Sequence, residues 1–208
     1  VKTPLSQEQQ QYVALIKNSA HHLLTVINDI LDFSKIEAQK LELDVVPFQL
    51  REHIAELLTL FEIPVQEKGL ALTYSIDASV PEWVVSDPTR LHQIITNLLN
   101  NAIKFTEKGS ISLTVKHQYV DEKRVQLEFR VEDTGIGMTG EQVKRIFLPF
   151  SQADSGTSRQ YGGTGLGLSI SQELSTMMGG SLGCESEYGK GSRFFFTIVA
   201  ERLKEKPL

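Results

Sequence analysis

A glycine-rich loop that runs directly into an apolar helical pattern restricts this chain more than any other feature. Residues 162–169 read Gly-Gly-Thr-Gly-Leu-Gly-Leu-Ser, with four glycines in six residues. Because glycine loses much conformational entropy and packs nothing, clustered glycines are expected where the backbone needs positive φ or close approach. The helix predicted after them would turn unpaired N–H groups and its positive dipole end toward the loop. The stretch therefore predicts an anion site, for which phosphate is the usual occupant.

The order of residues in this loop separates it from two common phosphate-binding loops. A Walker loop ends in Gly-Lys-Ser/Thr, and the dinucleotide fingerprint has the spacing G-x-G-x-x-G after a strand. The loop has neither pattern. A flexible glycine linker is the alternative, but the direct continuation into an apolar helix argues against it.

The composition is that of an ordinary globular chain. Of the 208 residues, 40% are hydrophobic and 23% are charged, which allows one good-sized core with an appendage, or two small domains. A net charge of −5 gives no basic footprint, so no nucleic-acid partner is expected. The single cysteine, Cys184, excludes an internal disulfide framework and fits a reducing compartment. We expect a cytoplasmic piece that meets a membrane only through segments outside this sequence.

The N-terminal region predicts one long amphipathic helix. Ser6 and Gln9 have the spacing of a capping box, and apolar residues between 13 and 34 follow the heptad rule. A helix of this length needs a partner helix, which we expect outside this sequence or from another molecule. His21 and His22 lie on it as exposed or groove-lining residues, since no acidic or cysteine ligand lies one turn away.

The main domain is expected to begin after residue 40. Residues 41–45 alternate as a strand and residues 46–48 break that pattern before a second helix, which Pro64 ends or kinks. A strand is expected at 70–76. Asp87 and Pro88 are an N-cap and a first-turn proline, so they predict the start of a third helix that runs to about residue 105.

The third helix carries a polar stripe beside its apolar one. The stripe contains Arg90, Asn97, Asn101 and Lys104 at helical spacing. Asparagine is a poor helix former, and ordinary surface polarity would more often use Glu and Lys. Two amide oxygens four residues apart suit a hard cation, and an amine one turn further suits a phosphate. We therefore favour a ligand site on this face.

A carboxylate is predicted where a core residue is due. Residues 111–116 and 125–131 read as paired strands, and Asp133 continues the parity of the buried face of the second. A buried carboxylate needs hydrogen-bond donors, so Asp133 should have a dedicated one. A turn-capping aspartate before glycine is the alternative, and the parity favours the functional interpretation. Gly135 and Gly137 would let the backbone pass close by.

The remaining segments complete the expected site. Residues 151–161 are polar and without apolar periodicity, which is typical of a mobile lid. Arg159 could reach a phosphate from this lid, and an exposed arginine without a partner is the alternative. Strands at 181–185 and 193–199 should form a terminal hairpin that lies at a sheet edge or completes the sheet.

Taken together, these residues resemble the ATP-binding module of sensor histidine kinases of the hybrid type, within the gyrase and histidine-kinase ATPase superfamily. Residues 97–105 resemble its asparagine box, 133–137 its first glycine box, 147–150 its phenylalanine box and 163–167 its second glycine box. Residues 30–38 resemble the second helix of the dimerisation hairpin. Four motifs in the right order are far more specific than any one alone.

The resemblance implies an α/β fold. We expect a two-layer sandwich of a mixed sheet and about three helices, the Bergerat-type ATP-binding fold, preceded by one long heptad-patterned helix. The expected divisions are residues 1–40 as a remnant of the dimerisation and phosphoacceptor hairpin, 41–204 as the catalytic ATP-binding domain, and 205–208 as a tail.

The resemblance also implies roles for single residues, with ATP and Mg²⁺ as cofactors. Asp133 would accept from the adenine amino group, Asn101 would be the magnesium ligand, and Lys104 and Arg159 would neutralise phosphate charge. Asn97 falls where gyrase-type ATPases carry a water-activating glutamate, and an amide cannot act as that base. Catalytic residues would be Asn97, Lys104 and Arg159, and nucleotide-binding residues Asn101, Phe105, Asp133, Gly135, Gly137, Gly163, Thr164, Gly165, Leu166, Gly167 and Leu168.

The function implied is transfer of the γ-phosphate of Mg-ATP to a histidine, for onward transfer to an aspartate of a response-regulator receiver domain. The kinase would be a homodimer through its helical hairpin. Residues 1–5 either end the acceptor box or form the inter-helix turn, which the capping box favours, so the acceptor histidine lies outside this sequence. Two alternatives stay open: a nucleotide-binding regulatory or scaffolding module without transfer, and a gyrase-type ATPase.

Overall fold

The computed structural model describes residues 5–151 and 164–203, except the side chains of residues 18, 21 and 22. The expected lid therefore lies almost wholly outside the described residues, and so do Arg159 and Gly163. The elements in chain order are α1 (Gln7–Glu37), β1 (Val46–Gln49), α2 (Leu50–Glu67), β2 (Ala71–Ile76), β3 (Trp83–Ser86), α3 (Pro88–Phe105), β4 (Ser110–Tyr119), β5 (Arg124–Asp133), α4 (Gly140–Arg145), α5 (Gly167–Met177), β6 (Leu182–Glu187) and β7 (Gly191–Leu203).

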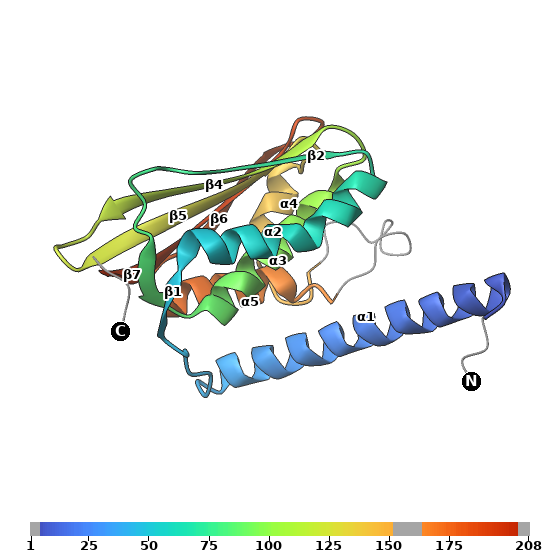
Figure 1. The fold of residues 1–208 in the computed structure, drawn as a ribbon, viewed down its shortest axis with the longest axis horizontal. Coiled ribbons are helices and arrows are strands. Elements are labelled where there is room, and N and C mark those ends of the chain that lie inside the picture. Colours follow the sequence, from blue (N-terminus) through green and yellow to red (C-terminus); the bar gives the residue numbers. More distant parts are fainter. Residues whose placement is uncertain (1–4, 152–163, 204–208) are drawn as a thin grey trace.

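The fold is a two-layer α/β sandwich, as expected. The sheet has the order β1-β3-β7-β5-β4-β2, and β6 pairs with β7 beside this path. The β2–β4 pair is parallel and the other pairs are antiparallel, so the sheet is mixed. Helices α2, α3 and α5 lie over one face of the sheet, and α1 extends beside them (Figure 1). We call everything from β1 to β7 the catalytic body, after the domain that the resemblance implies.

The core lies between the sheet and these helices. Alternate residues of β5, from Val125 to Val131, are buried, and the Phe129 ring stacks on Phe196 with 4.6 Å between ring centroids. The apolar stripe of α3 is buried against them. The buried side chains that alternate along the strands and those at helical spacing on α3 thus pack together in one apolar layer.

The start of α3 was predicted correctly, and its N-cap has a second task. The Asp87 carboxylate accepts from the Arg90 backbone N–H at 2.9 Å, and Pro88 occupies the first helical position. The other carboxylate oxygen of Asp87 accepts from the Asp44 backbone N–H at 2.9 Å. Asp87 therefore fixes both the start of α3 and the connection that leads from α1 into the catalytic body.

The structure contradicts one local prediction and refines two others. Residues 41–45 form no strand, and the expected break at 46–48 is instead part of β1, which pairs antiparallel with β3. A proline is tolerated there because β1 is an edge strand. Helix α2 continues past Pro64 to Glu67, since the exposed last turn tolerates a missing N–H. The terminal hairpin forms as expected, because β6 pairs antiparallel with β7, and β7 completes the sheet by pairing with β5 and β3 as well.

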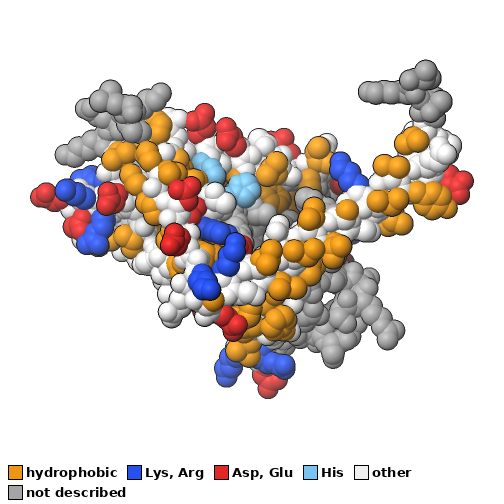
Figure 2. Space-filling model, turned by 90° about the horizontal axis from the view of Figure 1, so that it is seen from below, with side chains coloured by type: hydrophobic (Ala, Val, Ile, Leu, Met, Phe, Trp, Pro, Cys, Tyr) orange, Lys and Arg blue, Asp and Glu red, His pale blue; other side chains and the backbone are white. Residues whose placement is uncertain are grey.

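Helix α1 has the expected capping box between Ser6 and Gln9. Its last turns approach the catalytic body, where Phe33 and Ile36 pack against the core. The rest of its apolar face is exposed, and Figure 2 shows hydrophobic side chains along the arm that it forms. Within residues 5–151 and 164–203, no helix combines the length and apolar character needed to cross a membrane.

Candidate functional site

The polar stripe of α3 faces the beginning of α5. The Asn97 amide Nδ2 donates to the Ser171 hydroxyl at 2.9 Å, and the Asn101 amide Nδ2 lies 3.5 Å from the Asn97 Oδ1 that accepts from it. A Cβ atom built on Gly167 would lie 2.4 Å from the same Asn97 oxygen. The two helices can meet here because glycine leaves room for an asparagine amide.

The last turn of α3 holds the predicted cationic residue. The Lys104 ammonium lies 4.9 Å from the centroid of the Phe105 ring, and burial lowers the pKa of Lys104. From α2, the Lys68 ammonium donates to the carbonyl oxygens of Ile103 at 2.6 Å and Lys104 at 3.3 Å. Lys68 thereby stabilises the negative end of the helix dipole and fixes the turn that carries Lys104.

Asp133 is buried at the end of β5, with 9% of its surface exposed. The donor expected for it is the Gly135 backbone N–H, which lies 2.8 Å from Oδ1. Desolvation raises the pKa of Asp133, and the backbone N–H groups of Gly135 and Ser192 oppose this shift by favouring the carboxylate. Asp133 is thus a largely buried carboxylate whose pKa is raised and whose Oδ1 has a backbone donor.

The first glycine box follows Asp133 and is bonded to the end of α3. The Ile136 N–H donates to the Phe105 carbonyl at 3.2 Å. A Cβ on Gly135 would lie 2.3 Å from that same carbonyl oxygen, and one on Gly137, at φ +63°, would lie 2.0 Å from the Glu187 carbonyl oxygen. A larger residue would push the loop away from α3 at Gly135 and away from β6 at Gly137, so both glycines serve close backbone approach.

The second glycine box leads into α5. Gly165 has φ +71°, and its carbonyl accepts from the Phe150 N–H at 3.1 Å, which joins it to the phenylalanine box. Leu166 is the N-cap of α5 and makes no side-chain cap bond. The side chains of Leu166 and Leu168 pack in or against the core. The Leu166 N–H donates to the Thr164 hydroxyl at 3.1 Å, so the first-turn N–H groups of Gly167 and Leu168 are the ones suited to an anion.

Most of the predicted site residues lie on helix α3 or close to it. Four of them, Asn97, Asn101, Lys104 and Phe105, lie on it. The first glycine box, which follows Asp133, is bonded to its end through Ile136, and Gly167 contacts its middle. Sequence reasoning missed Lys68 and Ser171, whose partners lie on other helices. Ser171 lies one turn after the glycine box, but this spacing predicts its contact with Asn97 only if α5 is known to pack on α3.

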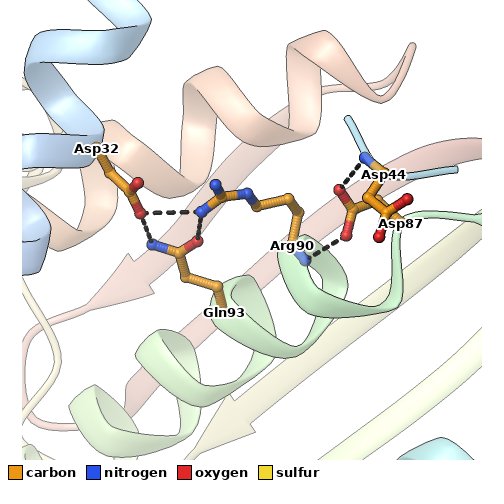
Figure 3. Close-up of polar contacts among 5 residues, drawn as sticks. All are labelled: Asp32, Asp44, Asp87, Arg90 and Gln93. Carbon is orange, nitrogen blue, oxygen red and sulfur yellow. Dashed lines mark hydrogen bonds and ion pairs between the residues drawn. The ribbon is translucent and has the colours of Figure 1, made fainter. Parts of the chain in front are cut away.

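Contacts between α1 and the catalytic body were also missed. The Asp32 carboxylate on α1 accepts from the Arg90 guanidinium and the Gln93 amide of α3, each at 2.9 Å (Figure 3). Asp29, one turn earlier, accepts from the Thr164 hydroxyl of the second glycine box at 2.9 Å. Burial raises the pKa of Asp29. The arrangement joins α1 directly to the candidate site.

A hard cation fits the donor set only if most of its ligands come from elsewhere. The described parts of the chain contain no group of three or more His, Cys, Asp or Glu residues that could hold a metal ion. The amide oxygens on α3 are neutral and few. Magnesium typically keeps several waters and binds through one or two protein ligands plus substrate phosphates, so the residues present fit Mg²⁺ that arrives with a nucleotide.

Two family models match the chain. The family described as "Histidine kinase-, DNA gyrase B-, and HSP90-like ATPase" matches residues 86–202, and "His Kinase A (phospho-acceptor) domain" matches residues 2–39. The first match covers the described parts of both glycine boxes and the polar stripe of α3. The second covers α1.

Similar proteins are sensor kinases. The chain is 47% identical over 198 residues to the signal transduction histidine-protein kinase BarA of Escherichia coli strain K12, covering 95% of this chain and 22% of BarA. It is 45% identical over 197 residues to the hybrid signal transduction histidine kinase B of Dictyostelium discoideum, covering 95% of this chain and 10% of that protein. The chain thus spans about a fifth or less of these relatives.

Solved structures of histidine kinases also resemble this chain. The crystal structure of full-length ShkA in complex with AMPPNP superposes with a TM-score of 0.78 and 35% identity, covering 99% of this chain and 42% of ShkA. Histidine kinase ThkA, solved in complex with the response regulator protein TrrA, gives a TM-score of 0.65 and 26% identity, covering 100% of this chain and 55% of ThkA. The chain belongs to the histidine kinase-, DNA gyrase B- and HSP90-like ATPase family, as an ATPase module of the sensor histidine kinases.

Proposed function

We propose that this chain binds Mg-ATP and transfers its γ-phosphate to a histidine that lies outside this sequence. The observation that carries the proposal is the meeting of the α3 amides with the uncapped beginning of α5. A Mg-bound nucleoside triphosphate needs oxygen ligands for its cation beside backbone N–H donors for its phosphates, and these two helices bring both together.

The adenine base is assigned to Asp133. Its Oδ1 accepts from Gly135 at 2.8 Å, and we assign Oδ2 as the acceptor for the amino group of adenine. Gly135 keeps the loop against α3 and Gly137 keeps it against β6, so the base would lie between this loop and the end of α3, near Phe105. The structure of ShkA with AMPPNP, an adenine nucleotide analogue, supports an adenine nucleotide as the ligand.

The phosphates are assigned to the beginning of α5. Backbone N–H groups of Gly165, Gly167 and their neighbours would bind phosphate oxygens, with Lys104 as a cation from α3. Gly163 and Thr164, which precede them in the sequence, are proposed as further nucleotide-binding residues, and Arg159 as a further cation. Asn101 would hold Mg²⁺, which when bound supplies charge neutralisation for phosphoryl transfer.

Transfer is favoured over hydrolysis. The Asn97 amide cannot take a proton from water, and in the structure it bonds to Ser171 and Asn101. A gyrase-type ATPase would need a carboxylate at this position. The sensor-kinase relatives also favour a histidine kinase over a gyrase-type enzyme.

The partners and organisation of the whole protein are proposals as well. The complex of ThkA with TrrA supports a response-regulator receiver domain as the onward acceptor, and the exposed apolar face of α1 supports a homodimer through a helical hairpin. We propose residues 1–40 as the hairpin part, 41–204 as the catalytic domain and 205–208 as a tail. We place this module in the cytoplasm, where ATP is supplied, with any membrane anchor in other segments.

Calorimetric titration with ATP, with and without Mg²⁺, tests the proposal. Asn101→Ala should remove the magnesium dependence, whereas Asn100→Ala, an exposed neighbour on the same helix, should leave it unchanged. Adding a hairpin that carries the acceptor histidine then tests transfer with labelled ATP. Binding without transfer would indicate the regulatory or scaffolding module, and steady hydrolysis without acceptor would indicate the ATPase.

A further inference from the structure

Ser171 is a polar residue in a position that an alanine could fill. Its surface is 1% exposed, on the side of α5 that packs against α3. A buried hydroxyl is unfavourable unless it is hydrogen-bonded. Helix α5 has two other buried serines, and both bond backbone carbonyls: Ser169 bonds Leu166 and Ser175 bonds Thr197, each at 2.8 Å. Ser171 differs because its partner is a side chain of another helix.

That partner, Asn97, is held on three sides. Its Nδ2 donates to Ser171 Oγ at 2.9 Å, and its Oδ1 accepts from Asn101 Nδ2 at 3.5 Å. Gly167 packs so closely on Asn97 Oδ1 that an added Cβ would lie 2.4 Å from it. Any rotation of the Asn97 amide would break one of these hydrogen bonds or press against the α5 backbone.

The chain of hydrogen bonds sets the orientation of Asn101. Its amide nitrogen is turned toward Asn97, and the oxygen of a planar amide lies on the opposite arm from the nitrogen. The oxygen of Asn101 is therefore the atom turned away from Asn97. A neutral oxygen is the ligand that a hard cation takes, and an inverted amide would offer it N–H groups instead.

We propose that Ser171 is a positioning residue, which orients Asn97 and through it the magnesium ligand Asn101. The proposal rests on the function proposed above and extends it. In this arrangement Asn97 acts as the link between two helices and does not itself hold the metal. Because Ser171 lies one turn after the second glycine box, the phosphate-binding backbone and the metal ligand are held by the same helix.

Residues that orient a metal ligand affect metal affinity strongly, typically by about 10- to 100-fold. Ser171→Ala should therefore raise the Mg²⁺ concentration needed for half-maximal enhancement of ATP binding by at least about tenfold. ATP affinity without Mg²⁺ should stay within about twofold of the wild type, because adenine and backbone contacts are untouched.

The experiment is calorimetric ATP binding over a series of Mg²⁺ concentrations, with melting temperature measured in parallel. Ser175→Ala is the matched control, since it removes the same atom from the same helix and breaks a bond to backbone. It should lower the melting temperature and leave the Mg²⁺ dependence unchanged. In an Asn97→Ala background, Ser171→Ala should have no further effect on Mg²⁺ dependence, because the link is already broken.

Three results separate this proposal from the assigned site. Equal Mg²⁺ dependence of Ser171→Ala and Ser175→Ala, with Asn101→Ala still losing magnesium binding, would overturn the positioning role and leave the site intact. An unchanged Mg²⁺ response in Asn101→Ala would overturn the site itself. If Ser171→Ala fails to fold, Ser171→Cys keeps the size and a weak acceptor, and an intermediate loss of Mg²⁺ affinity is expected; wild-type dependence there would overturn the proposal.

Discussion

Replacing Asp133 with asparagine tests the adenine assignment through a single atom. The side chain keeps its shape, but it can offer only one acceptor oxygen. In the structure the Gly135 N–H donates to Oδ1 at 2.8 Å. The asparagine oxygen is expected to keep this bond, so its amino group takes the place of Oδ2 and turns a donor toward the adenine amino group.

The loss of affinity follows from the hydrogen bond that disappears. A hydrogen bond to a charged group contributes about 1.5–3 kcal/mol. Since 1.4 kcal/mol corresponds to a factor of ten, ATP should bind roughly 10- to 150-fold more weakly to Asp133→Asn. Inosine triphosphate carries a carbonyl where ATP carries the amino group, and it should lose less affinity or gain some, because the new donor faces an acceptor.

Although Asp133→Asn should weaken ATP binding, it should not lower the stability of the ligand-free protein at neutral pH. Burial raises the pKa of Asp133 above its ordinary value of 3.8, so the folded state holds this proton more tightly than the unfolded chain. The free energy of unfolding therefore falls as pH rises through the interval between the two pKa values, and the penalty is complete above it. At neutral pH the ligand-free Asp133→Asn variant should melt no lower than wild type. Below pH 3.8 its advantage should vanish.

The assay is calorimetric titration with both nucleotides, with thermal melting as a fold check. Glu132→Gln makes the same charge change one residue earlier, on the other face of β5, where the carboxylate bonds Arg193 at 2.6 Å. It should bind ATP as wild type does. Wild-type ATP affinity in Asp133→Asn, or an undiminished preference for ATP over inosine triphosphate, would refute the assignment of the adenine group to this carboxylate.

Other perturbations test the core, the first glycine box and the α1 contact. Phe129→Ala should lower the free energy of unfolding by about 3–5 kcal/mol in denaturant titrations. Gly135→Ala would place its Cβ 2.3 Å from the Phe105 carbonyl oxygen, so nucleotide affinity should fall while circular dichroism stays that of a folded protein. Asp32→Asn weakens an ion pair with Arg90 whose side chains are 15% and 20% exposed, and hydrogen exchange in the last turns of α1 should become easier by about 1 kcal/mol.

Sequence patterns were sufficient wherever one residue type leaves few structural options. Asp87 followed by proline predicted the start of α3, and the capping box at Ser6 predicted the start of α1. The parity of β5 predicted a buried Asp133 with its own donor. In each case the deciding interaction lies within a few residues along the chain, so local sequence contains the information.

The missed features depend on distant partners. Strand β1 contains a proline and is stabilised by pairing with β3, some forty residues away, so its local sequence read as a break. The position of β7 in the sheet depends on its pairing with three other strands. Ser171 and Lys68 are unremarkable as isolated letters, since their role comes from the helix packed against them. The roles assigned to the site residues remain predictions that the binding experiments address.

The Thr164 hydroxyl links helix α1 to the second glycine box. It donates to Asp29 of α1 at 2.9 Å and accepts from the Leu166 N–H at 3.1 Å. A ligand that shifts Thr164 on binding changes the free energy with which α1 lies against the catalytic body. By thermodynamic reciprocity, moving α1 changes the affinity for that ligand by the same factor. The effect of displacing α1 on ligand affinity and the effect of ligand binding on the position of α1 would then report the same coupling free energy.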